Sequence, residues 1–342
     1  MKIVKSEDHR THAPTGELYG GELVVPFERP ERWDIIVARL NEVGLTDFME
    51  PDPLDMGGVG RIHEAAFLHF LETAWDQWRA EQYNGEALPT VIPARRMQQR
   101  EPDHIDGKLG YFCMAIETAI TEGTWNAARA SAAIAQTGQR LVSAGDRTAF
   151  SLCRPPGHHA ASDLYGGYCF LNNAAIAAQG FLDAGASRVA ILDVDFHHGN
   201  GTQDIFFRRS DVMFLSLHGD PRAAFPHFLG YADETGEGEG EGFNINYPMR
   251  DGADFHTWHN ALEDACVRIG EYAPDAVVVS LGVDTFKEDP ISFFRLESAD
   301  FLTYGARIEK IGLPTLFVME GGYAIDAIGI NTANVLQGFL GA

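Results

Sequence analysis

Three short hydrophobic runs in this sequence end directly in acidic residues or histidines. The run VAIL leads into Asp193, the run AVVVSLGV leads into Asp284, and the run FSLC opens into RPPGHH, where His158 and His159 stand side by side. Short β-rich runs that finish in such groups are typical of parallel strands whose carboxyl ends carry a site. Polar clusters are costly beside buried strands, so a purely structural origin for three of them is hard to sustain. The pattern indicates an enzyme that holds a metal ion.

The order of strand-like and helix-like segments predicts the fold class. Hydrophobic runs predict strands at residues 3–5, 149–153, 189–194, 212–217, 276–283 and 315–319. Helical patterns lie between them, among others at residues 124–143, 172–184, 257–269, 299–311 and 325–339. This alternation predicts an α/β fold with a mostly parallel sheet and helices on both faces. Because helices rather than linkers fill the intervals, we expect a single domain over residues 1–342.

Composition restricts the class of protein. The 342 residues are 45% hydrophobic, which supports a substantial core. No apolar stretch reaches membrane-spanning length, and the N-terminal residues lack the apolar region of a signal peptide. The four cysteines show no CxxC spacing, so we expect reduced thiols and a cytoplasmic location. Neither GxGxxG nor GxxxxGK[ST] occurs, so the usual phosphate cradles of nucleotide-binding folds are missing from the sequence.

The formal net charge of −23 restricts the partners of the protein. Such a field repels nucleic acid and attracts small cations, which raises their local concentration and association rate. Acidity that only keeps the protein soluble is the competing explanation, and charge alone favours it. The charge becomes informative once a cationic substrate is considered.

The segment Asp195-Phe196-His197 has the spacing of a metal site. Residues i and i+2 project to the same side at a strand end, so the two side chains can hold one ion. Asp284, at the end of another strand, supplies a third ligand and leaves a fourth position for water, as in a catalytic zinc site. The same ligand set accepts Fe(II), Mn(II) or Co(II). A DxH segment alone is more often a coincidence, but Asp284 and the histidine pair favour a metal.

His158 and His159 follow a rigid Pro-Pro-Gly turn and are candidates for acid–base catalysis. Imidazole titrates near neutral pH, so it can take a proton from water and return it to a leaving amine. Each ring needs an orienting partner, and Asp193 and Asn200 flank the metal motif with suitable chemistry. An isolated pair is more often an accident of a loop, but this pair follows a strand end of the same sheet.

Tyr323 is a candidate oxyanion donor. Two glycines after a strand let the backbone turn sharply and place this phenol over the end of the sheet. Loss of one such donor costs about 10²–10³ in rate. A GGY sequence by itself is usually only a turn, so the interpretation depends on the other motifs.

Taken together, these motifs resemble the arginase–deacetylase superfamily, and within it the metal-dependent histone deacetylase-like amidohydrolases. Six motifs occur between residues 149 and 323 in the same order as in that family: RPPGHHA, GGYCFLNN, LDVDFHHGNGTQ, SLHGDP, SLGVDTFKEDP and MEGGY. The resemblance to bacterial acetylpolyamine amidohydrolases extends over nearly the whole chain and includes SEDH, GELYGGELV, HEAAFLHFLETAWDQW and GYFCMAIETAI. As a set the motifs are highly specific.

The resemblance implies a metal set and a catalytic set. The implied ligands of one Zn²⁺ are Asp195, His197 and Asp284. The implied ligands of a structural K⁺ are Asp193, Asp195, His197, Ser216 and Leu217. A second monovalent-cation site is a weaker implication, near Phe206, Arg209, Val212 and Phe243. The arginase branch instead binds two Mn²⁺, and this sequence has the single-metal pattern.

The resemblance also assigns catalytic and channel residues. His159 is implied as general base and acid, supported by Asn200, and His158 as its electrostatic partner, supported by Asp193. Tyr323 corresponds to the carbonyl-polarising tyrosine. The implied channel residues are the aromatic pair Tyr168 and Phe225 and, as acceptor of the substrate amide N–H, the carbonyl of Gly167.

The implied substrates are N-acetylated polyamines of the acetylputrescine, acetylcadaverine and acetylspermidine type, hydrolysed to acetate and free amine. The distal ammonium needs a carboxylate, and the candidates are Glu117, expected in a helical run after Gly110, and Asp106. Each acid also fits a solvated helix face. The negative field would steer a polycation towards the site.

Residues 72–107 resemble the insertion through which acetylpolyamine amidohydrolases dimerise and narrow the channel entrance. Its aromatic residues Trp75, Trp78 and Tyr83 suit an interface. A loop folded back on its own domain is the alternative. We expect a homodimer with no nucleic-acid and no membrane partner.

Three other functions are weighed against acetylpolyamine hydrolysis. A lysine deacetylase for acetylated peptides or proteins would use the same chemistry on another substrate. A non-catalytic acetyl-amine binding protein would keep the fold, but the intact ligand set, histidine pair and Tyr323 disfavour it. A binuclear ureohydrolase would bind two Mn²⁺ per chain.

Overall fold

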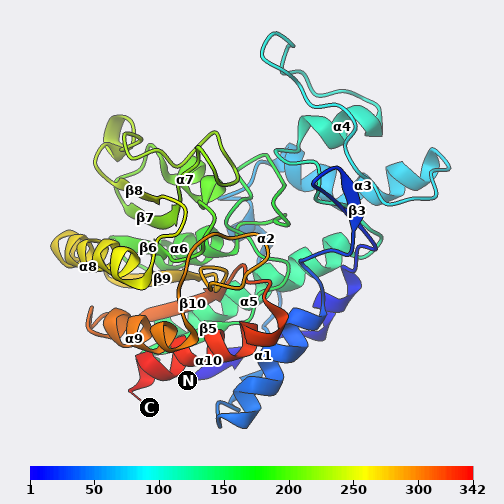
Figure 1. Ribbon diagram of the computed structural model, residues 1–342. Helices are drawn as coiled ribbons and strands as arrows, with labels where there is room; N and C mark the ends of the chain where they lie inside the picture. The colour runs from blue at the N-terminus through cyan, green and yellow to red at the C-terminus, as the bar shows by residue number, and fades with distance from the viewer. Residues whose placement is uncertain (342) are drawn as a thin grey trace.

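A parallel sheet at the centre of the molecule carries the fold (Figure 1). The computed structural model describes residues 1–341, and within them the sheet has eight strands in the order β4-β1-β5-β10-β9-β6-β7-β8. All neighbouring strands in this sheet are parallel. The strands are β1 (Lys2–Val4), β4 (Phe48–Met49), β5 (Thr148–Ser151), β6 (Val189–Asp193), β7 (Val212–Gly219), β8 (Asn244–Met249), β9 (Ala276–Leu281) and β10 (Thr315–Met319). A separate antiparallel hairpin consists of β2 (Glu17–Tyr19) and β3 (Glu22–Val24).

Helices connect the strands and cover the sheet. They are α1 (Glu31–Glu42), α2 (Met56–Val59), α3 (Ala65–Ala80), α4 (Ile105–Tyr111), α5 (Thr124–Ser143), α6 (Asn173–Asp183), α7 (Asn200–Phe206), α8 (Phe255–Tyr272), α9 (Ser298–Glu309) and α10 (Ile325–Leu340). Two 3₁₀ turns, η1 (Glu7–Thr11) and η2 (Gly238–Gly240), complete the secondary structure. Of the helices in residues 1–341, none is both long and apolar enough to pass through a bilayer.

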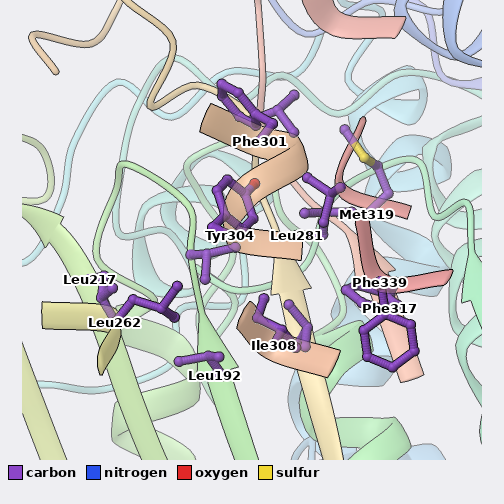
Figure 2. Close-up of a cluster of buried hydrophobic side chains, with 14 of the residues drawn as sticks. Leu192, Leu217, Leu262, Leu281, Phe301, Tyr304, Ile308, Phe317, Met319 and Phe339 are labelled. Atoms are coloured by element: carbon purple, nitrogen blue, oxygen red, sulfur yellow. The ribbon is translucent and has the colours of Figure 1, made fainter. Parts of the chain in front are cut away.

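The sheet is buried on both faces. Successive side chains of a strand point to opposite faces, and in β9 Val277 and Val279 join one hydrophobic cluster while Val278 joins another. The first cluster contains residues of α1, α8, α9 and α10, and part of it is drawn in Figure 2. The second contains residues of α3, α5 and α6. Two-sided burial explains why the central strands read as unbroken hydrophobic runs.

The predicted fold class is confirmed. All six predicted strands are present with ends shifted by at most two residues, and the five named helices are present. Two edge strands were not predicted, because β4 is very short and β8 contains two asparagines and a proline that disfavour strand structure. The hairpin β2–β3 and the helices α1 and α3 were also not predicted.

Residues 72–107 comprise the second half of α3, an irregular segment, and the first residues of α4. The irregular segment extends away from the body of the molecule near the top of Figure 1. The start of this segment packs against Trp78 of α3. Trp78 Nε1 donates to the Gly85 carbonyl at 2.8 Å, and the centroids of the Trp78 and Tyr83 rings are 4.3 Å apart. The role of this segment in dimerisation stays a prediction.

Candidate metal centre and active site

The carboxyl ends of four adjacent strands gather the polar motifs. β5, β10, β9 and β6 are neighbours in the sheet. Beyond their ends come, respectively, the histidine pair, Tyr323, Asp284 and the Asp195–His197 segment. Parallel strands bring their carboxyl ends to one edge, so residues more than 100 positions apart meet there.

Asp195, His197 and Asp284 form a cluster with the geometry of a metal site. One ligand atom from each residue lies within 4.8 Å of the others, and all three residues are buried. His197 Nδ1 is 3.0 Å from Asp284 Oδ2 and 3.3 Å from Asp195 Oδ1. The main chain orients both carboxylates, because Gly321 N donates to Asp195 Oδ2 at 2.8 Å and Phe196 N donates to Asp284 Oδ1 at 2.7 Å.

The charges of this cluster fit a divalent cation. Burial and the charge of Asp195 raise the pKa of Asp284 to about 8, so the two carboxylates repel each other in the protein alone. Burial opposes the charged form of His197, but Asp195 and Asp284 raise its pKa to about 10. A bound cation satisfies both carboxylates and leaves the imidazole neutral as a ligand. The donor set therefore suits zinc and related transition metals.

Glycine is required beside the two carboxylates of the candidate metal triad. A Cβ atom on Gly282 would overlap Asp195 Oδ2. A Cβ atom on Gly321 would lie 2.6 Å from Asp284 Oδ2 and 2.7 Å from Asp195 Oδ2, closer than van der Waals contact allows. These two positions keep the space that the carboxylates occupy.

His158 and His159 have different hydrogen-bond partners. His158 Nδ1 lies 3.0 Å from Asp193 Oδ2, and His159 Nδ1 lies 2.7 Å from Asn200 Oδ1. An amide oxygen only accepts, so His159 Nδ1 carries the proton and its Nε2 is left with a free lone pair. His159 lines the cavity described below. This ring can accept a proton from a group in the cavity.

The two imidazoles also differ in pKa. Burial lowers the pKa of His158, but the charges of Asp195 and Asp193 outweigh burial and raise it to about 10. Burial and the neighbouring His158 charge hold the pKa of His159 well below its usual value. The ring centroids are 4.1 Å apart, close enough for such coupling. His158 is the charged partner and His159 the neutral one.

Tyr323 lies at the same edge of the sheet, beyond the carboxyl end of β10. It is 7% exposed, its ring lies 5.7 Å from the Tyr168 ring, and the Arg32 guanidinium is 4.9 Å from its centroid. Burial raises the pKa of the phenol well above its usual value, so it remains a hydrogen-bond donor. Arg32 Nε donates to the Gly322 carbonyl at 2.7 Å and thereby supports the turn that carries Tyr323.

A cavity of about 320 Å³ leads to these groups. Its wall includes Gly167, Tyr168 and Phe225, together with His159 and Tyr323. Gly167 and Tyr168 both have positive φ, +57° and +67°, and a Cβ atom on Gly167 would overlap the His159 ring. The backbone at Gly167 therefore approaches the His159 ring closely. Of the predicted channel residues, all three lie in this wall.

The two predicted carboxylates lie in different places. Glu117 lines the cavity and accepts from Gly167 N at 3.0 Å, but it lies on a turn between α4 and α5, not in the expected helical run. Asp106 lies on α4, is half-buried, and accepts from Tyr83 Oη at 3.1 Å. The structure thus brings Glu117, but not Asp106, into the cavity of the same chain.

The predicted potassium ligands lie on two adjacent strands. Asp193 on β6 is the register partner of Ser216 on β7, and Leu217 follows. Ser216 Oγ is 2.8 Å from His218 Nδ1. For the second monovalent site, Arg209 N donates to the Phe206 carbonyl at 2.9 Å, and Val212 begins β7. Potassium at the first place and a monovalent cation at the second stay predictions.

Several residues near the site carried no role in the sequence interpretation. Glu17 on β2 lines the cavity and accepts from Tyr168 Oη at 3.0 Å. Glu320 is fully buried and its Oε2 accepts from the main-chain N–H groups of Gly157 (2.6 Å) and His158 (3.1 Å). The only signal for either was an acid inside a motif, in GELYGGELV for Glu17 and in MEGGY for Glu320.

A cavity lined by His197 of the candidate metal triad, by a neutral imidazole and by a phenol has the groups that amide hydrolysis requires. The class of protein that fold and site define is a hydrolytic enzyme on a parallel α/β sheet. The chain belongs to the histone deacetylase domain family, whose model matches residues 26–339. This confirms the family resemblance and places the chain among the deacetylase-type hydrolases.

Curated relatives agree over the whole length of the chain. It is 56% identical over 341 residues to the acetylpolyamine amidohydrolase of Mycoplana ramosa, with all of both chains covered. It is 56% identical over 344 residues to acetylpolyamine amidohydrolase 1 of Pseudomonas aeruginosa, covering 100% of this chain and 99% of the relative. The crystal structure of an acetylpolyamine aminohydrolase from Burkholderia pseudomallei superimposes with a TM-score of 0.94 at 37% identity, covering 99% of this chain and 98% of the other.

Proposed function

We propose that the protein hydrolyses the acetamide bond of N-acetylated polyamines of the acetylputrescine, acetylcadaverine and acetylspermidine type, giving acetate and the free amine. One observation carries the proposal: the cavity lined by His197 of the Asp195–His197–Asp284 triad, by His159 and by Tyr323 also has carboxylates in its wall. The names of the relatives support the substrate class.

The metal triad fits one Zn²⁺, with Fe(II) or Co(II) as alternatives for the same donors. When bound there, zinc polarises the acetyl carbonyl and makes a water molecule acidic enough to act near neutral pH. His159 removes the proton from the attacking water at its Nε2, because Asn200 fixes the proton on Nδ1. His159 then returns a proton to the departing amine nitrogen.

Tyr323 donates its phenol proton in a hydrogen bond to the carbonyl oxygen as negative charge develops there. Burial keeps the phenol protonated, and the rings and main chain around it fix its direction. The carbonyl of Gly167, in the cavity wall, accepts the amide N–H of the substrate and aligns the acetyl group. His158, charged and paired with Asp193, stabilises the nearby negative charge.

Glu117 and Glu17 give the cavity its preference for a cation. Both line the wall: the Tyr168 hydroxyl donates to Glu17, and the main-chain N–H of the preceding Gly167 donates to Glu117. Tyr168 and Phe225 contact the aliphatic stem of the substrate, and the two carboxylates meet its ammonium group. The net charge of −23 steers a polycation towards the cavity.

Three further features belong to the proposal. A structural K⁺ would be held by Asp193, Asp195, His197, Ser216 and Leu217. Carbonyl and carboxylate oxygens at strand ends are suitable donors for such a cation. Two copies of the chain would pair through residues 72–107, and Asp106 would meet substrate only from a second copy. The four cysteines are free and buried, which suits a reducing cytoplasm.

A substrate panel tests the proposal against the lysine deacetylase alternative. The zinc-reconstituted protein is assayed for kcat/KM on acetylputrescine, acetylcadaverine and acetylspermidine and on an acetyl-lysine peptide. We expect the acetylpolyamines to be preferred. A peptide preference of roughly tenfold or more would identify a lysine deacetylase instead, and two Mn²⁺ per chain in a metal count would identify a binuclear enzyme.

A further inference from the structure

We propose that Asp289 is a positioning residue that holds Tyr323 in the orientation the reaction needs, an inference that rests on the proposed function. Asp289 lies in the segment after β9, five positions beyond the metal ligand Asp284, and is 5% exposed. Neither the metal triad nor the histidine pair uses it. A buried carboxylate needs a reason, because its burial is costly unless its oxygens accept hydrogen bonds.

All the hydrogen bonds of Asp289 go to main-chain groups around the active site. Its Oδ2 accepts from Tyr323 N at 2.7 Å and from Ala324 N at 3.2 Å. Its Oδ1 accepts from Ile291 N at 3.1 Å, and Ile291 lines the cavity. One carboxylate therefore ties the main chain of the tyrosine to a segment of the cavity wall.

The turn that carries Tyr323 depends on such outside support. Residues 320–324 have no regular secondary structure, and Gly322 adopts a φ of +125°, a conformation that residues with a side chain rarely reach. α10 follows with Ala324 at its N-cap, and alanine has no side-chain acceptor for main-chain N–H groups. Asp289, from another part of the chain, instead accepts from the N–H of this N-cap residue and from the N–H of Tyr323 before it.

Arg32 holds the opposite side of the same turn. Its Nη2 donates to the Glu320 carbonyl at 2.8 Å and its Nε donates to the Gly322 carbonyl at 2.7 Å. The turn is thus fixed through its carbonyls by a guanidinium and through its N–H groups by a carboxylate. The phenol oxygen lies at the far end of the side chain, so a small rotation of the main chain displaces it further than it displaces the backbone.

Asn at position 289 cannot replace the carboxylate. Three N–H donors on two sides require two acceptor oxygens, and an amide has one oxygen and one NH₂ group. In Asp289→Asn the side-chain NH₂ group therefore faces a main-chain N–H group, and no hydrogen bond forms between two donors. Asp289→Ala removes all three hydrogen bonds. Misplacement of a reacting group by about 1 Å can cost roughly 10²-fold, so we expect a kcat loss of about tenfold in Asp289→Asn with KM changed less than about threefold.

The test compares Asp289→Asn and Asp289→Ala with Asp254→Ala as a matched control. Asp254 is exposed and caps α8, where it accepts from Thr257 N at 2.9 Å and from Thr257 Oγ1 at 2.8 Å, and it does not line the cavity. Kinetics on acetylputrescine are measured at equal zinc content for each variant. The control should lose stability without losing kcat.

A double-mutant cycle with Tyr323→Phe decides the assignment. If Asp289 acts through the Tyr323 hydroxyl, Asp289→Asn lowers kcat about tenfold in the wild type and has almost no further effect in Tyr323→Phe. An equal loss in both backgrounds, or a wild-type kcat in Asp289→Asn, overturns the proposal.

Hydrogen exchange provides a measurement that does not require turnover. The Tyr323 and Ala324 amides should exchange faster in Asp289→Asn, while the amides of β6 and β9 keep their protection. Unchanged exchange at Tyr323 and Ala324 contradicts the proposal even if the variant is less active. Absence of activity on acetylpolyamines in the wild type would instead contradict the proposed function, and exchange would still test the position of the turn.

Discussion

Alanine at position 321 should weaken metal binding without disturbing the fold. Gly321 does not have a positive φ, so the substitution adds volume and no backbone strain. The new Cβ atom would lie 2.6 Å from Asp284 Oδ2 and 2.7 Å from Asp195 Oδ2, whereas ordinary contact begins at 3.4 Å. Both metal carboxylates must then move by about 0.7–0.8 Å, and metal sites tolerate shifts of only about 0.2 Å. We expect zinc affinity to fall roughly 100-fold or more, equivalent to about 3 kcal/mol.

The assay is equilibrium competition for zinc between the protein and a chelator of known affinity, followed by a count of zinc per chain. Gly270→Ala is the control, because nothing lies within 4 Å of an added Cβ atom at that position in α8. It should bind zinc like the wild type and gain up to about 1 kcal/mol of stability from better helix propensity. If Gly321→Ala held zinc as tightly as Gly270→Ala, the carboxylates beside Gly321 would not be the metal ligands.

Three other perturbations probe separate parts of the site. Tyr323→Phe should lower kcat by about 10²–10³ while zinc content stays the same, and an unchanged rate would refute its role as donor. Burial raises the pKa of Glu17 to about 7, so its carboxylate is charged above that pH and mostly neutral below it. The kcat/KM for acetylputrescine should therefore contain a step that rises through about pH 7, which Glu17→Gln removes and which a neutral N-acetyl alkylamine does not show. Removal of zinc by a chelator should abolish hydrolysis and lower the Tm, because Asp195 and Asp284 then repel each other while buried. A Tm that is unaffected by the chelator would argue against a metal at this triad.

The fold was predictable where burial is two-sided and uniform. β6, β9 and β10 lie in the middle of the sheet, and their unbroken hydrophobic runs mark them and their carboxyl ends. Edge strands carry no such signal. β8 pairs with one neighbour only, and its asparagines join a polar network, with Asn244 Nδ2 and Asn246 Nδ2 both donating to Gln203 Oε1. A strand whose side chains form hydrogen bonds lacks the hydrophobic pattern from which strands are predicted.

The clustering of the candidate metal triad was predictable for a related reason. Its three residues come one to three residues after predicted strands, and parallel strands bring those positions to one edge whatever the length of chain between them. Asp195, His197 and Asp284 needed only correct strand ends. Glu117 was assigned to a helix that the chain does not form there, because the acid was read from a motif and not from a strand end.

Residues that support or surround the site were harder to predict because their partners are set by tertiary packing. Glu17 meets Tyr168 across 151 positions, from a hairpin that does not belong to the main sheet. Asp289 reaches Tyr323 from one irregular segment to another, where no periodicity applies. The chemistry is therefore built on central strands, whereas the carboxylates of the cavity wall come from a hairpin and a turn. We therefore expect substitutions of Glu17 to change the amine preference without moving the triad, since its carboxylate accepts hydrogen bonds from Phe27 N and Tyr168 Oη and from no residue of the triad.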